Sequence, residues 1–179
     1  METETIIFGG GCFWCTEAVF TMLKGVTSAE PGYAGPSTWL RASGPTYEEV
    51  STGETPFIEV VKIEYDPDRL SFEELLKVFF ATHDPTTPNR QGNDVGPQYH
   101  SAIFYTTQQQ KKKAEHYVMM LGKIGNKPIV TTVAPLEKFW PAEDYHKQYY
   151  EHHKDAPYCQ VVIDPKVEKV QEKFGNLLK

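Results

Sequence analysis

Residues 6–17, with the sequence IIFGGGCFWCTE, decide how the chain begins to fold. Three β-forming residues precede three glycines, and no glycine or proline interrupts residues 13–23. The pattern predicts a short strand, a tight turn and a helix that begins at Cys12. A thiol at a helix start lies among unpaired backbone N–H groups and at the positive end of the helix dipole, which favours the nucleophilic thiolate. We therefore expect Cys12 to be reactive.

The composition excludes several classes of protein. The 179 residues carry a formal net charge of −6, which argues against nucleic acid or an anionic membrane as the main partner. No basic and apolar leader is visible, and no run of about 18 apolar residues would span a membrane. Three cysteines without an export signal favour free thiols in a reducing compartment, so we expect a cytoplasmic protein.

The remaining pattern predicts alternating strands and helices. Residues 28–53 are polar and rich in glycine, and we expect a long loop there. Strands are expected at residues 57–65, 101–106 and 129–136, and helices at 71–82, at 108–121 closed by Gly122, from Pro141, and at 165–178. Ser71 and Glu74 predict a capping box at the start of the helix at 71–82.

These elements predict an α/β (α+β) fold in a single domain, residues 1–179. We expect a two-layer sandwich with a ferredoxin-like core, in which a mixed β-sheet carries helices mainly on one face. Long active-site loops would gather at the Cys12 end.

The strand expected at residues 57–65, FIEVVKIEY, alternates between two faces. Glu59 falls on the same face as the apolar residues at positions 57, 61, 63 and 65. A carboxyl group among apolar neighbours is desolvated, which raises its pKa and lets it hold a proton near neutral pH. We therefore expect Glu59 to be able to act as an acid.

Four interpretations of Cys12 and Cys15 are open from the residues alone. Their spacing is typical of thioredoxin-like dithiols, although only a few β residues precede it and bulky Phe13 and Trp14 fill it. A zinc site would combine them with Cys159 and a histidine at position 146, 152 or 153, but no second cysteine pair is present. The third interpretation is a phosphate-binding loop, but GGGC lacks the Lys and Ser/Thr that such a loop requires. The fourth interpretation is a cysteine nucleophile served by an acid from elsewhere in the chain.

The fourth interpretation agrees with motifs spread over nearly the whole chain. They are GCFW at residues 11–14, GYAG at 32–35, PTYEEVSTG at 45–53, FIEVVKIEYDP at 57–67, HDPT at 83–86, NRQGND at 89–94, GPQYHSAIFY at 96–105 and HKQYYEHHKDAPYC at 146–159. Together, in this order and spacing, they resemble the peptide methionine sulfoxide reductase A family. The resemblance implies the α/β sandwich of that family.

The resemblance also implies roles for residues at the motif positions. Cys12 matches the nucleophile, which attacks the sulfoxide sulfur and becomes a sulfenic acid, and Glu59 matches the acid that protonates the sulfoxide oxygen. Tyr33 and Tyr99 match two phenols that hydrogen-bond this oxygen, and Asp94 matches a supporting carboxylate.

Phe13 and Trp14 would then line an apolar pocket for the S-methyl group, where burying one methyl contributes on the order of 1 kcal/mol. Position alone favours a simpler interpretation for most of these residues. The aromatic side chains would be packing residues, Asp94 a turn residue, and Glu59 an ion-pair partner of Lys62 as readily as an acid.

Two thiols are candidates for resolving the sulfenic acid. Cys159 matches the recycling cysteine of the family, follows Pro157 in a segment that we expect to be flexible, and is the favoured candidate. Cys15 stands where the family usually has glycine and is the alternative. It lies one helical turn from Cys12, but a disulfide also needs the two Cβ atoms to converge.

The sequence as a whole predicts a peptide-methionine (S)-S-oxide reductase that acts on free and protein-bound methionine-S-sulfoxide and repairs oxidised proteins. We expect no metal or organic cofactor, thioredoxin as the reductant of an intramolecular disulfide, and a monomer. Residues 159–179 would form the recycling segment and the terminal helix. The alternatives are a general dithiol-disulfide oxidoreductase that uses Cys12 and Cys15, and a zinc-stabilised binding module.

Overall fold

The computed structural model describes residues 2–179. In this part of the chain, six strands form one sheet in the order β7-β6-β1-β3-β2-β8, and β4 and β5 form a separate hairpin. The strands are β1 (Glu4–Gly9), β2 (Val26–Gly35), β3 (Ile58–Tyr65), β4 (Arg90–Gln91), β5 (Asp94–Val95), β6 (Ala102–Tyr105), β7 (Thr132–Pro135) and β8 (Lys138–Pro141). The α-helices are α1 (Phe13–Thr21), α2 (Tyr47–Ser51), α3 (Phe72–Thr82), α4 (Gln108–Ile124), α5 (Tyr149–His152) and α6 (Asp164–Phe174).

The centre of the sheet confirms the predicted ferredoxin-like core. Strands β1, β2, β3 and β6 with helices α1 and α3 follow the order β-α-β-β-α-β along the chain, and they lie in the sheet as β6-β1-β3-β2. Every neighbouring pair among these four strands is antiparallel. Strand β7 adds to β6 in parallel, so the sheet is mixed, as predicted.

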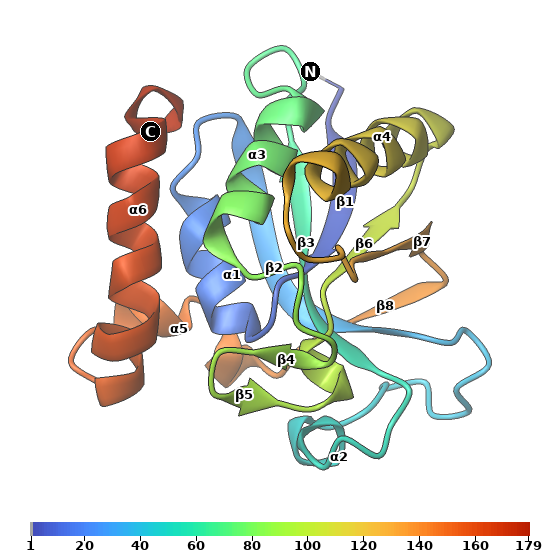
Figure 1. Ribbon diagram of the computed structural model, residues 1–179. Coiled ribbons are helices and arrows are strands. Elements are labelled where there is room, and N and C mark those ends of the chain that lie inside the picture. The colour runs from blue at the N-terminus through green and yellow to red at the C-terminus, as the bar shows by residue number, and fades with distance from the viewer. Residues whose placement is uncertain (1) are drawn as a thin grey trace.

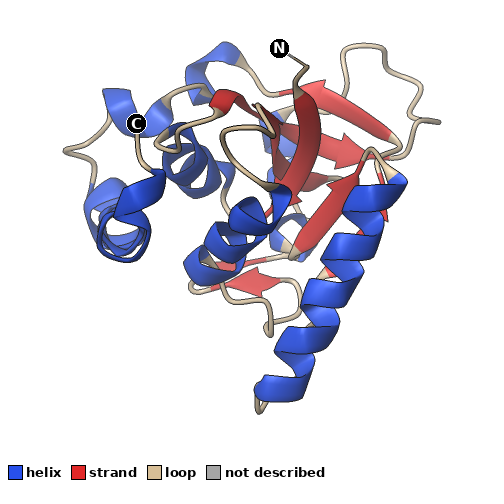
Figure 2. Ribbon diagram, turned by 90° about the horizontal axis from the view of Figure 1, so that it is seen from above, coloured by secondary structure: helices blue, strands red, loops and turns tan. Residues whose placement is uncertain are grey.

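The helices form a layer on the sheet (Figure 1). Helices α1 and α3 lie over the central strands, and α6 packs on α1 and α3 from outside. Figure 2 shows α4 and α6 at opposite ends of this layer. Helix α3 has the predicted capping box, in which Ser71 and Glu74 satisfy each other's backbone N–H groups.

The prediction of a loop at residues 28–53 is wrong for its first part, because residues up to Gly35 belong to β2, which lies between β3 and β8. The glycines that suggested a loop instead permit close packing of the backbone. A Cβ atom on Gly32 would lie 2.3 Å from the carbonyl oxygen of Trp140 on β8. Further on, Thr46 and Glu49 form a capping box that begins the short helix α2.

Three boundaries in the second half also differ from the prediction. Helix α4 does not end at Gly122 but continues to Ile124 and is capped at Gly125. A glycine such as Gly122, which faces open space, lowers the stability of a helix without ending it. Pro141 ends β8 instead of starting a helix, and a 3₁₀ turn at Asp144–His146 precedes the four-residue α5. Cys159 lies in a π-helical turn, Cys159–Ile163, that leads directly into α6, so the segment expected to be flexible is helical.

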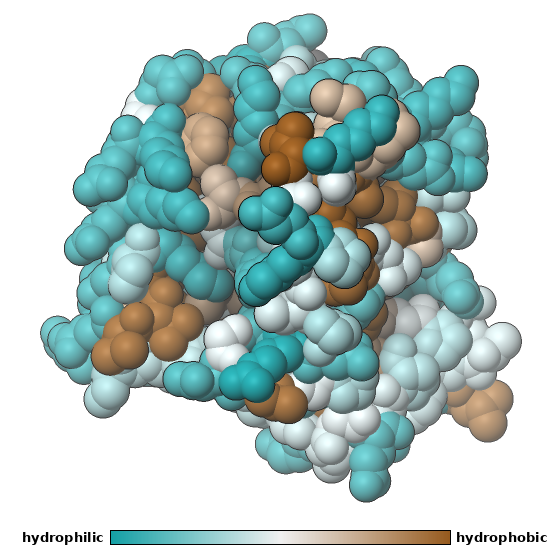
Figure 3. Space-filling view, viewed as in Figure 1, coloured by the Kyte–Doolittle hydropathy of each residue, from teal (hydrophilic) through white to brown (hydrophobic). Residues whose placement is uncertain are grey.

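The surface of the molecule is mainly polar on the side that Figure 3 shows, with small, separate hydrophobic areas. Across residues 2–179, no helix has the combination of length and apolar character that crossing a bilayer requires.

The turn between β1 and α1 depends on Gly11, which has a φ of +93° and would place a Cβ atom 2.6 Å from Cγ of Gln91. We predict that Gly11→Ala lowers the free energy of unfolding by about 1–3 kcal/mol, because it combines backbone strain with this clash. Urea unfolding would measure the change.

Gly122→Ala is the matched control, since Gly122 lies inside α4 with no neighbour within 4 Å of an added Cβ. The same substitution should there raise the free energy of unfolding by about 0.5–1 kcal/mol. Equal effects at the two positions would contradict this account of the turn.

Candidate active site

Cys12 is placed at the end of the glycine turn, as the N-cap residue of α1. Its side chain is 8% exposed and belongs to an apolar cluster that also contains Cys15 and Cys159. All three cysteines are free thiols. The fold therefore brings the predicted nucleophile and both predicted resolving thiols into one cluster, although Cys159 is about 150 residues away along the chain.

The expectation that the helix start stabilises a thiolate at Cys12 is wrong for the substrate-free protein. Burial raises the pKa of the Cys12 thiol well above its usual range, and neighbouring Cys15 and Glu59 raise it further. The side chain of Cys12 makes no capping hydrogen bond, and the N–H group of Phe13 points to Glu59 instead. Cys12 is therefore a thiol until another charge favours its ionisation.

Glu59 is the second residue of β3 and is 1% exposed. Its Oε2 atom accepts a hydrogen bond from the N–H of Phe13 at 3.2 Å, whereas its buried Oε1 atom has no partner among residues 2–179. Burial raises the pKa of Glu59 to about 8, with a further contribution from the charge of Asp94. The carboxyl group is thus protonated at neutral pH, and its free oxygen is the one that can carry the proton and donate it.

Tyr33 lies opposite Glu59 in the pairing of β2 with β3, so the two side chains project from the same face of the sheet. The hydroxyl of Tyr33 is buried and donates a hydrogen bond to Oε1 of Glu143 at 2.9 Å. In the substrate-free protein this donor is therefore occupied.

Asp94 and Tyr99 come from the segment between α3 and β6, Asp94 from β5 and Tyr99 from a 3₁₀ turn at Pro97–Tyr99. Tyr99 packs against the cysteine cluster, and burial together with the charge of Glu59 raises its pKa, so that its hydroxyl remains protonated. Asp94 accepts a hydrogen bond of 2.7 Å from the hydroxyl of Tyr158, which also lies 3.8 Å from Sγ of Cys15. Tyr158, the residue before Cys159, thus links the segment that carries Cys159 to Asp94.

Phe13 and Trp14, the predicted wall of the substrate pocket, are the first two residues of α1. Phe13 is buried, and its ring packs against those of Tyr33 at 5.8 Å and His146 at 5.1 Å. Trp14 stacks on Tyr149 at 3.7 Å, and its indole N–H donates to Nδ1 of His146 at 3.0 Å. The wall is therefore fixed both by aromatic contacts and by a hydrogen bond.

Cys15 differs from Cys12 in its surroundings. Its pKa is lowered to about 7, first by its hydrogen bond with the Cys12 thiol and also by the charge of Lys166. A cleft of about 540 Å³ opens beside the two thiols and is lined by Asp94, Tyr158 and Lys166, among others. Cys159 is fully buried, and this burial raises its pKa.

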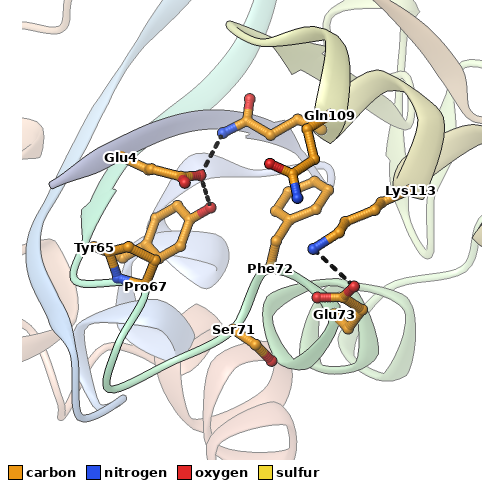
Figure 4. A pocket seen from close by; sticks show the side chains of 9 residues that line it. Glu4, Tyr65, Pro67, Ser71, Phe72, Glu73, Gln109 and Lys113 are labelled. Atoms are coloured by element: carbon orange, nitrogen blue, oxygen red, sulfur yellow. Dashed lines mark hydrogen bonds and ion pairs between the residues drawn. The ribbon is translucent and has the colours of Figure 1, made fainter.

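The zinc interpretation has no set of ligands in the described part of the chain, where no group of three or more His, Cys, Asp or Glu side chains could hold a metal ion. A separate pocket of about 160 Å³ lies near the start of β1 (Figure 4). Its polar groups pair with one another, Tyr65 with Glu4 and Lys113 with Glu73, and it contains none of the predicted site residues.

Over residues 4–178 the chain matches the family model described as peptide methionine sulfoxide reductase. The chain belongs to this family. The peptide methionine sulfoxide reductase MsrA of Sulfolobus acidocaldarius is 53% identical over 176 residues, which cover 98% of this chain and 97% of that protein. The MsrA of Thermus thermophilus is 49% identical over 179 residues, which cover 100% and 99%.

Among solved structures, reduced Mxr1 of Saccharomyces cerevisiae is similar, with a TM-score of 0.81 and 34% identity over 88% of this chain and 90% of that one. These similarities confirm the predicted family and fold. The protein is a peptide-methionine (S)-S-oxide reductase, and the reaction that it catalyses is the reduction of methionine sulfoxide.

The structure also brings Glu143, His146 and Tyr158 to the site of the reductase. The sequence gave Glu143 and Tyr158 no role, and it gave His146 only the role of a possible zinc ligand. Each contacts a predicted site residue that is more than 60 positions away. The family motif at residues 146–159, which contains His146 and Tyr158, was the signal in the sequence for these two residues, whereas no motif contains Glu143.

Replacing Glu59 tests its protonation. Because its pKa is raised from 4.5 to about 8, Glu59 should make the wild-type protein lose stability as the pH rises through this range, and Glu59→Gln should lose less. Between about pH 5 and about pH 8, the difference in free energy of unfolding between Glu59→Gln and the wild type should therefore shift by about 2–4 kcal/mol in favour of the variant. Denaturant titrations at several pH values measure this difference.

The exposed Glu54 supplies the control, since Glu54→Gln should follow the pH dependence of the wild type. A Glu59→Gln curve parallel to that of the wild type would mean that Glu59 is ionised in the folded reductase.

Proposed function

We propose that the reductase transfers the sulfoxide oxygen to Cys12 with Glu59 as the proton donor. The observation that carries this proposal is the free Oε1 of a buried, protonated Glu59, held beside the Cys12 turn by the N–H of Phe13. A site with one proton to donate and one thiol to attack matches the needs of sulfoxide reduction.

In the first step, Glu59 gives its proton to the sulfoxide oxygen, which makes the sulfur electrophilic. The positive charge on the substrate then favours ionisation of Cys12, whose proton passes to the Glu59 carboxylate. Sγ of Cys12 attacks the sulfur, the S–O bond breaks as the oxygen passes to Sγ, and the products are methionine and a Cys12 sulfenic acid. The sulfoxide gains two electrons and Cys12 loses two.

Tyr99, Tyr33 and Asp94 complete this proposal. The hydroxyl of Tyr99 donates a hydrogen bond to the sulfoxide oxygen. The hydroxyl of Tyr33 breaks its hydrogen bond with Glu143 and donates a second one to the same oxygen. Asp94 supports the site through its hydrogen bond with Tyr158. Phe13 and Trp14 receive the S-methyl group in the apolar wall.

A second thiol then attacks the sulfenic acid and releases water, forming an intramolecular disulfide with Cys12. Cys159 is the favoured thiol and Cys15 the alternative, and both belong to the same cluster as Cys12. A dithiol donor of the thioredoxin type reduces the disulfide by exchange. Yeast Mxr1 has been crystallised in complex with Trx2, which supports this choice of donor.

The wider setting follows from these steps. Residues 1–179 act as one catalytic domain, in which residues 159–179 are the recycling segment, and the reaction needs neither a metal nor an organic cofactor. Free methionine-S-sulfoxide and oxidised proteins are the substrates, so that the activity repairs oxidised proteins. Three free thiols suit a reducing compartment such as the cytoplasm.

Cys12→Ser tests the nucleophile. With separated sulfoxide epimers, we expect this variant to lose at least about 10³-fold in kcat/KM on the S epimer, because it lacks the thiol that accepts the oxygen in the proposed mechanism. Cys159→Ser is the control, and it should still yield one equivalent of methionine in the absence of reductant. Activity retained in Cys12→Ser would refute the mechanism.

The resolving step has its own test. After one turnover without reductant, mass spectrometry of a proteolytic digest should find a disulfide between Cys12 and Cys159, and Cys15→Ser should leave it in place. A bridge between Cys12 and Cys15 in the wild type would reverse the assignment.

A further inference from the structure

Glu143 lies between β8 and the 3₁₀ turn at Asp144–His146, and its carboxylate collects hydrogen-bond donors from three parts of the chain. Oε1 accepts from the buried hydroxyl of Tyr33 at 2.9 Å. Oε2 accepts from the backbone N–H of Tyr47 at 3.2 Å and from the hydroxyl of Tyr145 at 3.0 Å. Both oxygens are therefore used, which fixes the orientation of the carboxylate.

Glu143 also faces His146. Nδ1 of His146 accepts from the indole N–H of Trp14, so in the neutral imidazole the hydrogen is on Nε2. Nε2 lies 3.8 Å from Oε2 of Glu143. The negative charge of Glu143 thus favours the tautomer that Trp14 requires.

The groups that Glu143 holds converge on one residue. The rings of Tyr33, Tyr47 and His146 pack against Phe13 with centroid distances of 5.8, 6.2 and 5.1 Å. His146 in addition holds Trp14. Glu143 thus acts indirectly, through the residues that it contacts, on both side chains that are proposed to receive the S-methyl group.

We propose that Glu143 is the positioning residue of the methyl pocket. It acts through Tyr33, Tyr47 and His146 to set the wall formed by Phe13 and Trp14, and it holds the Tyr33 hydroxyl until the sulfoxide enters. This inference rests on the proposed function, which gives Phe13 and Trp14 their role. Glu143 makes no hydrogen bond to Cys12 or Glu59 in the described chain, so the chemistry itself should not require it.

A single-turnover experiment on the reduced protein separates binding from chemistry. Methionine formation is followed without reductant at increasing concentrations of methionine-S-sulfoxide. We expect Glu143→Ala to raise the half-saturating concentration about 10-fold and to change the maximal rate less than about 2-fold, the signature of lost binding. Glu143→Gln keeps an acceptor oxygen and should restore most of the affinity.

Two further measurements exclude a merely structural effect. Glu137→Ala removes another glutamate that accepts a backbone N–H, here from Ser37 at an exposed site, and should leave both constants unchanged. In a double-mutant cycle, Glu143→Ala should cost less affinity in the Tyr33→Phe background than in the wild type, because part of its action passes through the Tyr33 hydroxyl.

The proposal fails if Glu143→Ala binds the sulfoxide as the wild type does, if it lowers the maximal rate instead of the affinity, or if its effect adds fully to that of Tyr33→Phe. The wild type in the same experiment reports on the proposed function separately. If the wild type formed no methionine or no Cys12 sulfenic acid, the mechanism would fail whatever Glu143 does.

Discussion

A desolvated carboxyl group is the constraint on which the site depends. Glu59, near the start of β3, has almost no contact with water, and one backbone N–H is its only hydrogen-bond partner in the described chain. Burying an ionised carboxylate in such a place is costly, so the group remains neutral. A neutral acid is what sulfoxide activation requires, and the fold thus maintains a group that is poor for stability but suited to catalysis.

The neighbouring elements can be understood from this constraint. The N–H that contacts Glu59 belongs to Phe13, the first residue of α1, so the same turn places the acid and Cys12 side by side. Burial acts on both groups in the same direction, since it suppresses the charged form of each. The site therefore holds two protons when empty and develops charge only when the sulfoxide accepts one of them.

The sequence predicted those features that depend on local pattern. Alternation along β3 placed Glu59 on the apolar face, and the capping box of Ser71 and Glu74 located the start of α3. The prediction from sequence failed for β2, because Gly32 and its neighbours are typical of loops. Only the close approach of the partner strand β8 shows why a glycine is needed there. It also failed for the charge state of Cys12, since burial in a cluster with distant Cys159 outweighs the helix start.

Glu143 and Tyr158 could not be found from the sequence for a similar reason. Their partners, Tyr33 and Asp94, lie 110 and 64 positions away, so no local pattern records the contact. Family motifs supplied the proposed chemical roles of Cys12 and Glu59, whereas the hydrogen bonds that hold the site together appear only in three dimensions.

The protonation of Glu59 in the substrate-free protein tests this account most directly. Carbon-13 NMR of the glutamate carboxyl groups, with the Glu59 signal assigned by its absence in Glu59→Gln, measures the pKa of this one group. The account predicts a carboxyl group that is protonated at neutral pH and titrates with a pKa near 8. An ionised Glu59 at neutral pH, titrating near the ordinary glutamate value of 4.5, would contradict it.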